Sequence, residues 1–485
     1  MAEGVPLKPR LEPGHYRGRW SVPDETGAVQ RLDGDLDLTA GRPPTVSASG
    51  RVPLAAEQGD GFTTAAFPQR FTHPVIVGEL RNGPTVLLLD AEVETWHDDL
   101  AFINARAALV GPARAVLDVP PFFDTITVQI TGLDAYAGVG PIRSFTLPAS
   151  GQSFYEHLWQ VEPNPDSTQT WADDHAELTL DWASAVAQEL AFFRMAFSPV
   201  AIVTLDEPLD VDDCLTMWIE PLRRIISLAT GRVEDITYLT LSRAAGDGDG
   251  EHDEFQVYGH KLDQAPFATR DTDVRKINAA FRATTEATSP LQMLRVWQRL
   301  HDEHHPLLET YGASIVLPRQ HPRSTYLLLV QALEGLFGHE HQTEHEENVA
   351  AYQAKRDAAI AALEQVPDLP APVLKFLRKY LMRKPHGGLD QCLTHMFTSL
   401  PYDVSEELAA TTLVQQVIHD AGETVGLPAA LRAVRNDLSH GTKGYPTMDL
   451  YAVVQILDRV ARAHMLRVLG CGTDAQLKAA RGDRP

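Results

Sequence analysis

The sequence is poor in cysteine, in long apolar runs and in positive charge, and each shortage argues against a class of protein. Its 485 residues include only three cysteines, Cys214, Cys392 and Cys471, and no C-x-x-C motif. This pattern argues against a disulfide framework and a zinc ribbon, and we expect three reduced thiols. No uncharged apolar run approaches the roughly 18–20 residues of a membrane helix, and the N-terminus lacks an apolar signal-peptide core. We therefore expect a cytoplasmic protein with no membrane partner.

Basic residues are outnumbered, since 42 Lys and Arg face 65 Asp and Glu, a formal net charge of −23. Such a charge favours solubility. It argues against a protein that coats nucleic acid non-specifically, because attraction to phosphate needs a positive surface, although a local basic site stays compatible with it. At roughly 150 residues per domain the length suggests about three domains, each large enough to bury its own core.

Three regions of different character follow one another. Residues 1–150 predict a β-rich N-terminal domain, either a sandwich or an open barrel, because short apolar or alternating segments recur between Pro and Gly turns. Residues 151–320, after a polar linker at 149–153, predict a mixed α/β or α+β region. The clearest strand segments are 35–39, 74–78, 85–89, 125–131, 177–182 and 200–205, and a helical period covers 211–228.

Residues 321–485 predict an all-α helical bundle. Apolar residues at three- and four-residue intervals mark helices at 323–338, 350–364, 370–383, 389–400, 404–421, 427–439 and 448–469. No repeat of fixed period appears, and the connections are short enough for a bundle. The expected fold class is therefore a multidomain α+β protein that ends in a helical bundle.

One segment of the bundle, residues 426–443, carries polar residues at the end of an apolar helix. Pro428 suits the first turn and Gly441 suits the stop. Thr447 is expected to cap the next helix. Arg435 and His440 then lie at the end of the first helix and at the turn before the second. The apolar stripe that predicts this helix consists of Leu427, Leu431, Val434 and Leu438.

Arg435 and His440 are candidates for phosphodiester cleavage without a metal. An imidazole can take a proton from a ribose 2′-hydroxyl or give one to the leaving oxygen, and a guanidinium binds the charge that grows on the phosphorane. Asn436 and Asp437 can orient either side chain by hydrogen bonds. Five residues of an ideal helix turn by about 500°, which leaves Arg435 and His440 about 140° apart unless the helix unwinds near Gly441.

The spacing of this pair is weak evidence by itself, because Arg299 and His304 repeat it in a charged run that ends at Pro306. Context separates the two copies, since Arg435 and His440 end an amphipathic helix of the terminal bundle. From the residues alone, a helix-end cap with a salt bridge stays open as the alternative to catalysis.

The run VRNDLSHG at 434–441, between two long helices, resembles the signature of HEPN domains, in which an Arg and a small polar residue are followed after a few positions by a His. The whole chain resembles the ApeA group of HEPN proteins, in which such a domain follows a β-rich N-terminal domain. The run QALEGL at 331–336 is similar to the first helix of that bundle. Segments 15–23, 32–36, 75–83 and 86–89 are similar to that N-terminal domain.

This resemblance implies a metal-independent endoribonuclease that leaves 2′,3′-cyclic phosphate and acts in anti-phage defence by abortive infection, with tRNA as a candidate target. In the family, Arg and His from two subunits meet across a two-fold axis, so a homodimer through the HEPN bundle is implied. Carried over by position, Arg435 stabilises the transition state, His440 is the acid or base, and Asn436 is the polar neighbour. No cofactor is implied. N-terminal regions that sense a phage-derived trigger or restrain the nuclease are expected.

A basic run at 375–384 is the candidate RNA-binding surface. It carries two aromatic residues and no acid, and on a helix most of its charges share one face, where Phe376 or Tyr380 can stack on a base or pack. The alternative is a solvated basic face over a core that includes these two rings. The basic residues are Lys375, Arg378, Lys379, Arg383 and Lys384.

Two other clusters are interpreted without a metal. His341 and His345 are four residues apart, yet nothing completes an H-E-x-x-H pattern. The acidic run at 246–254 lacks ligands that an EF-hand loop needs and is interpreted as a solvated loop. A metalloenzyme built on the two histidines would be sensitive to chelators. The main rival hypothesis is a non-enzymatic ligand- or protein-binding sensor whose bundle is only a dimerisation module.

Overall fold

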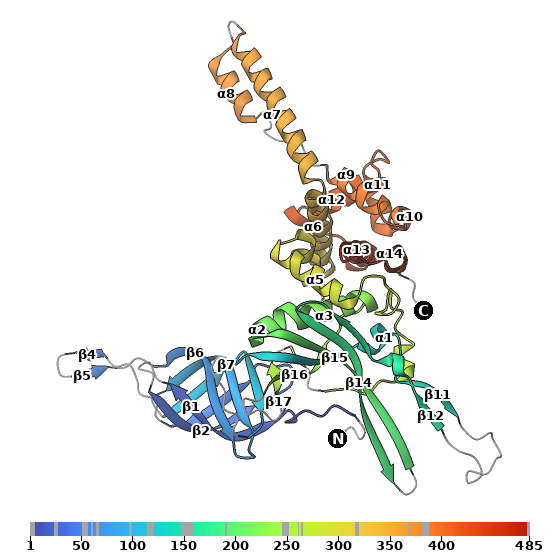
Figure 1. The fold of residues 1–485 in the computed structure, drawn as a ribbon. Coiled ribbons are helices and arrows are strands. Elements are labelled where there is room, and N and C mark those ends of the chain that lie inside the picture. Colours follow the sequence, from blue (N-terminus) through green and yellow to red (C-terminus); the bar gives the residue numbers. More distant parts are fainter. Residues whose placement is uncertain are drawn as a thin grey trace. The chain divides into compact units, whose positions relative to one another are not determined.

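The computed structural model divides into two compact units, Met1–Arg295 and Val296–Arg484, and Figure 1 traces the chain through both. The first unit is built on a β-sheet and the second is helical. The predicted linker at 149–153 and most of the predicted acidic loop at 246–254 lie outside the described residues. The structure describes residues 5–23, 28–50, 57–59, 62–64, 67–96, 99–113, 121–146, 160–189, 192–244, 252–259, 261–262, 265–315, 320–366, 369–380 and 388–482.

Six strands of the first unit close into a barrel. The order β7-β6-β1-β2-β3-β8 returns to its start because β7 pairs with β8 as well as with β6. Of the two predicted architectures, a sandwich and an open barrel, the structure therefore has the barrel, and its strands close on themselves. The strands are β1 (His15–Pro23), β2 (Val29–Asp37), β3 (Thr45–Ser49), β6 (Gln69–Leu80), β7 (Thr85–Trp96) and β8 (Leu100–Asn104).

Trp20 on β1 fills the interior of this barrel. Its side chain is 0% exposed, and its indole Nε1 donates to the carbonyl of Gly34 at 3.4 Å. Gly78 on the paired strand β6 leaves room for the ring, because a Cβ at this position would lie 2.3 Å from it. The apolar side chains packed in the same core include Leu36, Ile76, Val93 and Ile103. Removal of this apolar surface from water stabilises the closed barrel.

The same sheet continues beyond the barrel as antiparallel strands. From β7 it runs through β9 (Ala107–Gly111), β17 (His252–Gly259), β16 (Ile236–Ala244), β10 (Phe123–Ile130), β15 (Phe192–Leu209) and β14 (Ala176–Glu189) to β13 (Gln169–Ala172). Two hairpins form separate sheets, β4 (Glu57–Gly59) with β5 (Phe62–Thr64) and β11 (Ile142–Thr146) with β12 (Gln160–Pro163). Because β10 pairs with β15 and β16, strands from the first two predicted regions share one sheet. The division at residues 150 and 320 stays a prediction.

Helices pack on the part of the sheet outside the barrel (Figure 1). The period at 211–228 correctly predicted a helix, which runs as α2 (Val211–Asp213), the π-helical η2 (Cys214–Ile219) and α3 (Glu220–Thr230). α3 buries most of its side chains, η2 contacts β10, and α1 (Leu133–Ala137) contacts α3. The 3-10 helix η1 (Pro165–Ser167) and the helices α4 (Asp271–Val274) and α5 (Pro290–Asp302) follow in chain order.

The second unit is the predicted helical bundle, in which α13 contributes many of the buried side chains. α7 (Gln342–Glu364) and α8 (Ala371–Tyr380) contact each other, and among their described residues none is buried. We call this pair the α7–α8 arm; it extends away from the bundle in Figure 1. The bundle consists of η3 (Leu308–Gly312), α6 (Pro322–Glu340), α9 (Leu389–Thr398), α10 (Ser405–Ala409), α11 (Thr412–Asp420), α12 (Leu427–His440), α13 (Thr447–Val468) and α14 (Thr473–Arg481).

The predicted helices are confirmed, with differences at three places. Residues 404–421 form two helices, because Thr411 has extended dihedral angles and is the N-cap residue of α11. Thr447 is the first residue of α13 and not its cap, since Pro446 occupies the cap position. The sequence gives little signal for α14, because the residues it buries are alanines, Ala475, Ala479 and Ala480.

The three cysteines are free and buried, as predicted. Burial raises the pKa of the Cys214 and Cys392 thiols to about 12, so both are protonated and unreactive at neutral pH. None of the described helices combines the length and the apolar character that crossing a membrane requires.

Candidate functional site

α12 carries the predicted catalytic residues at its C-terminal end. The buried stripe of Ala430, Leu431, Val434 and Leu438 fixes the rotation of this helix against the bundle. Pro428 lies in the first turn, and Gly441 ends the helix in the left-handed conformation with φ 69°, both as predicted. With the stripe buried, Arg435, Asn436 and Asp437 are half-buried and His440 is exposed.

Arg435 makes two long polar contacts. Its Nη2 donates to Glu334 Oε2 on α6 at 3.4 Å, and its Nη1 donates to Asn436 Oδ1 at 3.3 Å. The side chains of Arg435 and Glu334 are 39% and 38% exposed. An ion pair this exposed contributes less than about 1 kcal/mol, so an anionic ligand can displace Glu334 from the guanidinium at little cost. The contact with Asn436 is of the orienting kind that the sequence predicted.

His440 is the last residue of α12, and its side chain is exposed. The helix does not unwind before Gly441, so the condition under which Arg435 and His440 would converge within one chain is not met. An unbroken helix leaves the two side chains about 140° apart. Within one chain they therefore lie on different faces of α12.

The carboxylate of Asp437 binds the turn that follows the helix. Its Oδ2 accepts a hydrogen bond from the Tyr445 hydroxyl at 2.6 Å, and its Oδ1 accepts one from the Thr442 hydroxyl at 2.7 Å. The hydrogen bond from Tyr445, and after it that from Thr442, lowers the pKa of Asp437. The backbone carbonyl of Asp437 also accepts from the N–H groups of Gly441 and Thr442. Asp437 was predicted to orient Arg435 or His440, and in the structure its carboxylate instead binds residues of the turn next to His440.

Neighbouring side chains hold the same turn in place. Arg323 at the start of α6 donates to the carbonyl of Leu438, and Lys443 Nζ lies 3.1 Å from Asp420 Oδ2 on α11. Sequence reasoning missed Arg323, because its contact with α12 joins residues 115 positions apart. It also missed Tyr445, although this residue lies only eight positions from Asp437 and a tyrosine close after the helix was a usable local signal. Glu334 gave one usable signal, a lone carboxylate within the apolar run QALEGL.

A cavity of about 640 Å³ lies beside Glu334, between α6, the start of α7 and α9. Phe337 and His341 line it, and their rings stack with centroids 4.2 Å apart. His341 also meets the ring of His395 edge-on at 4.8 Å. Because Glu334 contacts Arg435 and lines this cavity as well, the cavity adjoins the candidate site.

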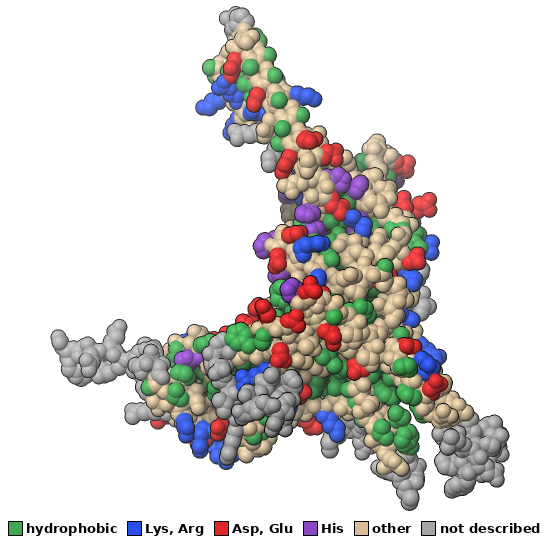
Figure 2. Space-filling view, in the orientation of Figure 1, with side chains coloured by type: hydrophobic (Ala, Val, Ile, Leu, Met, Phe, Trp, Pro, Cys, Tyr) green, Lys and Arg blue, Asp and Glu red, His purple; other side chains and the backbone are tan. Residues whose placement is uncertain are grey.

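Histidine side chains gather where α7 begins (Figure 2). His341 and His345 both line the cavity beside Glu334. Among the residues that the structure describes, no group of three His, Cys, Asp or Glu side chains is placed to hold a metal ion. His341 and His345 belong to the aromatic and polar wall of this cavity.

The described part of the basic run lies on α8. Lys375, Arg378 and Lys379 are exposed there, whereas Arg383 and Lys384 lie outside the described residues. Arg378 forms an ion pair with Glu364 of α7. Basic and hydrophobic side chains gather toward the far end of the α7–α8 arm in Figure 2.

The two aromatic residues of this run are accessible. Phe376 and Tyr380 are 58% and 59% exposed, and their ring centroids are 4.6 Å apart. Lys379 Nζ lies 5.0 Å from the centre of the Tyr380 ring. The two rings therefore do not form a core beneath the charges, while the choice between an RNA-binding face and a solvated face stays open.

The second Arg and His pair of the same spacing has a different structure. Arg299 is exposed on α5, which ends at Asp302. His304 lies beyond the helix in the left-handed conformation, with φ 50°. Its Nδ1 lies 3.9 Å from Glu309 Oε1.

Comparison with known proteins identifies the first unit. Residues 15–281 match the family model described as ApeA N-terminal domain 1. These residues include the closed barrel, the strands that continue from it, and helices α1 to α4. No curated protein and no solved structure matches the chain. Since the match spans more than half of the sequence, the chain belongs to the ApeA family of anti-phage proteins.

Proposed function

We propose that this chain is a metal-independent endoribonuclease of the HEPN type, which acts in anti-phage defence by abortive infection, with tRNA as a candidate target. The observation that carries the proposal is the end of α12. There Arg435 and His440 remain accessible, while the buried stripe and the hydrogen-bonded turn hold the backbone that presents them. Membership of the ApeA family supports the role in defence.

In the proposed reaction, a ribose 2′-hydroxyl attacks the adjacent phosphorus and the 5′-oxygen of the next nucleotide leaves. The products are a 2′,3′-cyclic phosphate and a free 5′-hydroxyl. His440 takes the proton of the attacking hydroxyl or gives one to the leaving oxygen. Arg435 binds the negative charge of the phosphorane, with Asn436 as its orienting neighbour.

The geometry of α12 supports the proposed homodimer through the bundle. Side chains about 140° apart on one helix cannot both face the same phosphate from the same side. If two copies pack α12 about a two-fold axis, Arg435 of one chain can face His440 of the other, and the symmetry produces two equivalent sites. The weak pair with Glu334 leaves Arg435 available for this role.

The α7–α8 arm is the proposed RNA-contacting surface. Its exposed Lys375 and Lys379 can neutralise phosphates, and the exposed rings of Phe376 and Tyr380 can stack on unpaired bases. Replacing both lysines by Gln should therefore weaken RNA binding and reduce the slope of log K against log salt by about one to two. Filter binding between 50 and 200 mM salt measures this slope.

The matched control for the arm is Lys478→Gln, an exposed lysine on α14. It should leave both the affinity and the salt slope unchanged. An identical loss with Lys478→Gln and with the lysine pair of α8 would mean that only overall charge matters, and the arm would then have no special role.

The ribonuclease proposal is tested by incubating the purified protein and its His440→Ala variant with total cellular RNA in EDTA. The wild type should release fragments with cyclic-phosphate and 5′-hydroxyl ends, because no metal takes part, and the variant should release none. If the purified wild type cleaves no RNA, the assay is repeated with phage-infected lysate. The reason is that the N-terminal unit is proposed to sense a phage-derived trigger or to restrain the nuclease. Cleavage of equal rate by the variant would refute the proposal.

A second candidate function is a non-enzymatic sensor, in which the bundle only dimerises and the β-rich unit binds a ligand. The observation that favours it is a cavity of about 840 Å³ in the first unit. This function predicts no RNA degradation under any condition. It also predicts that defence survives the replacement of Arg435 or His440 by Ala.

A further inference from the structure

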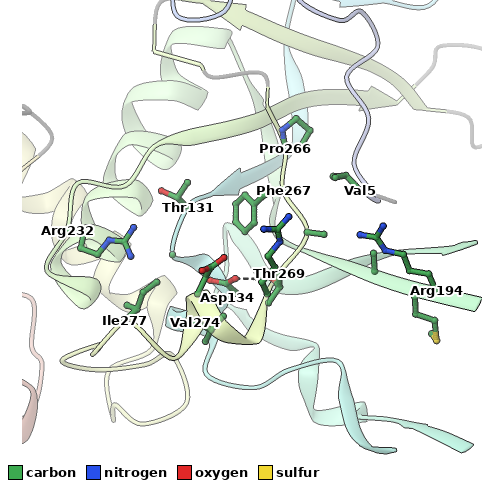
Figure 3. A pocket seen from close by; sticks show the side chains of 16 residues that line it. Val5, Thr131, Asp134, Arg194, Arg232, Pro266, Phe267, Thr269, Val274 and Ile277 are labelled. Carbon is green, nitrogen blue, oxygen red and sulfur yellow. Dashed lines mark hydrogen bonds between the residues drawn. The ribbon is translucent and has the colours of Figure 1, made fainter. Parts of the chain in front are cut away.

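The cavity of about 840 Å³ lies in the β-rich unit, outside the barrel. Its walls come from the residues after β10, the start of β15, the turn after α3 and the segment 266–277. Figure 3 shows Arg232 and Arg194 on opposite sides of the cavity, with Asp134, Thr269 and Phe267 between them. A volume of this size lies within the roughly 300–1,000 Å³ range of small-molecule sites.

Three arginines from separate parts of the chain line this cavity, in a protein whose net charge is −23. Arg194, Arg232 and Arg270 are all exposed. Two carboxylates, Asp134 and Asp273, also line it, and the charge of Asp273 is offset by Lys276, whose Nζ lies 3.0 Å from Asp273 Oδ1. Guanidinium groups that line a cavity are common binding groups for phosphate.

Arg232 is supported from behind by a buried carboxylate. Glu234 is 0% exposed and accepts hydrogen bonds from the hydroxyls of Thr230, at 2.7 Å, and Thr131. Arg232 Nε lies 3.7 Å from Glu234 Oε1, while the Arg232 side chain stays 54% exposed. Gly132 permits this arrangement, since a Cβ there would lie 2.6 Å from Glu234 Oε1. The guanidinium is thus held at the cavity while it remains accessible to a ligand.

The backbone of Phe267 is clamped by two buried polar side chains. Gln129 Nε2 and Ser198 Oγ donate to the Phe267 carbonyl at 2.9 Å and 2.6 Å, and the Phe267 N–H donates to Gln129 Oε1 at 3.0 Å. Gln129 and Ser198 are both fully buried. The half-buried ring of Phe267 therefore lines the cavity in a fixed position, where it can stack on a planar group.

Asp134 lies between the arginines and is also fixed. Its Oδ2 accepts from the Thr269 hydroxyl at 3.0 Å, and its Oδ1 accepts from the N–H of Ala135 at 2.8 Å. Burial raises the pKa of this carboxyl, because it destabilises the charged form. A ligand that donates a hydrogen bond to the carboxylate would stabilise that form. A carboxylate in such a place typically receives the hydroxyls of a ribose or the N–H groups of a base.

We propose that this cavity binds a small nucleotide, whose phosphates contact the arginines while its nucleoside contacts Phe267 and Asp134. The combination of guanidinium groups, a fixed aromatic ring and a fixed carboxylate fits a phosphorylated nucleoside better than inorganic phosphate. This site is independent of the proposed RNA cleavage, because its residues all belong to the β-rich unit. Its test therefore needs no RNA.

The test is titration calorimetry of the full-length protein with ATP, GTP, CTP and UTP, each alone, and with sodium tripolyphosphate. At least one nucleotide should bind with one site per chain, and tripolyphosphate should bind about tenfold more weakly or worse. Arg232→Gln and Arg194→Gln should each weaken the nucleotide by about tenfold or more, since each removes a charge-assisted contact. Phe267→Leu should weaken the nucleotide and leave tripolyphosphate unchanged.

Arg31→Gln is the matched control, because Arg31 is an exposed arginine on barrel strand β2. It should bind as the wild type does, and thermal unfolding of each variant verifies that it is folded. If Arg232→Gln unfolds because Glu234 loses its neighbour, the nucleotide affinity of Arg194→Gln is the result that tests the proposal. The proposal is overturned if no nucleotide binds, if tripolyphosphate binds as tightly as the best nucleotide, or if a folded arginine variant binds as well as the wild type.

Discussion

Three places in the helical unit have an Arg followed five residues later by a His. At Arg459 and His464 on α13 the histidine is fully buried, whereas the other two pairs have an exposed histidine and different backbones. Arg435 and His440 lie on one unbroken helix, and the turn after it is hydrogen-bonded through Asp437. Arg299 and His304 are separated by the end of α5, and His304 lies in a left-handed position with φ 50°.

The comparison indicates that the backbone around an Arg and a His, and not their spacing in the sequence, decides whether the two residues form a candidate site. In α12 the buried stripe and the left-handed Gly441 determine where both side chains lie. After α5 the chain has left the helix before it reaches His304, so the geometry that the shared spacing implies is lost. The predictions below test whether this contrast has functional consequences.

The largest expected effect is on RNA cleavage. His440→Ala and Arg435→Ala should each lower the rate by about 10²–10⁴-fold, because each removes a group that acts on the reacting phosphate. Arg299→Ala and His304→Asn are the matched controls, Asn being chosen because it tolerates the left-handed conformation. They should leave the rate within about twofold, since exposed substitutions change little. Gel assays measure the RNA cleavage rate of all four variants. Equal losses of rate in both pairs would contradict a special role for Arg435 and His440.

The second effect concerns the stability of the bundle in acid. His464 on α13 is fully buried, its Nε2 lies 2.8 Å from the Met396 carbonyl, and burial lowers its pKa to about 4. The unfolded chain takes up this proton near pH 6.5, so the free energy of unfolding should fall as the pH drops from 6.5 toward 4. Between pH 7 and pH 5 the loss is about 2 kcal/mol.

His464→Gln tests whether His464 is the group responsible for this effect. Glutamine keeps an N–H donor for the Met396 carbonyl and does not titrate, so the variant should lose less stability than the wild type between pH 7 and pH 5. Urea unfolding at the two pH values measures the difference. Identical pH dependence in the two proteins would show that His464 is not the group responsible.

A smaller effect is expected at the turn that has no equivalent after His304. Tyr445→Phe removes the hydroxyl that donates to Asp437 at 2.6 Å, which should cost about 1 kcal/mol and raise the pKa of Asp437 toward its ordinary value. Because the native pKa is lowered, the stabilisation is present above pH 4 and is lost as the pH falls through the native pKa.

The measurements for this turn are thermal unfolding and an NMR titration of the Asp437 carboxyl. Tyr451→Phe, on an exposed tyrosine of α13, is the control and should change neither. A Tyr445→Phe variant with an unchanged Asp437 titration would contradict the assigned hydrogen bond.

Local features of the sequence predicted α12 well and its surroundings poorly. Pro428 and Gly441 define the ends of the helix, and the apolar stripe defines its buried face, because each acts within a few residues of the chain. The pair of Arg435 with Glu334 joins residues 101 positions apart, and no local period encodes it. The same reason hides the pairing of β3 with β8, in which Thr45 lies opposite Asn104, although the alternation of the strands themselves is visible in the sequence.

The helix stays wound up to Gly441 for a physical reason. A left-handed glycine accepts the chain reversal at a single residue, so the helix can stay intact through His440. The intact helix then separates Arg435 from His440, and this separation supports the proposed site shared by two chains. We propose that the reacting groups come from different subunits.

One measurement tests this claim most directly. Arg435→Ala and His440→Ala proteins are assayed on total RNA in EDTA, first separately and then after mixing and subunit exchange. We predict no cleavage by either variant alone and recovery of part of the wild-type rate in the mixture, because each mixed dimer has one site with an intact Arg435 and an intact His440. Full cleavage by either variant alone, or no recovery from mixed dimers beside an active wild type, would contradict the shared site.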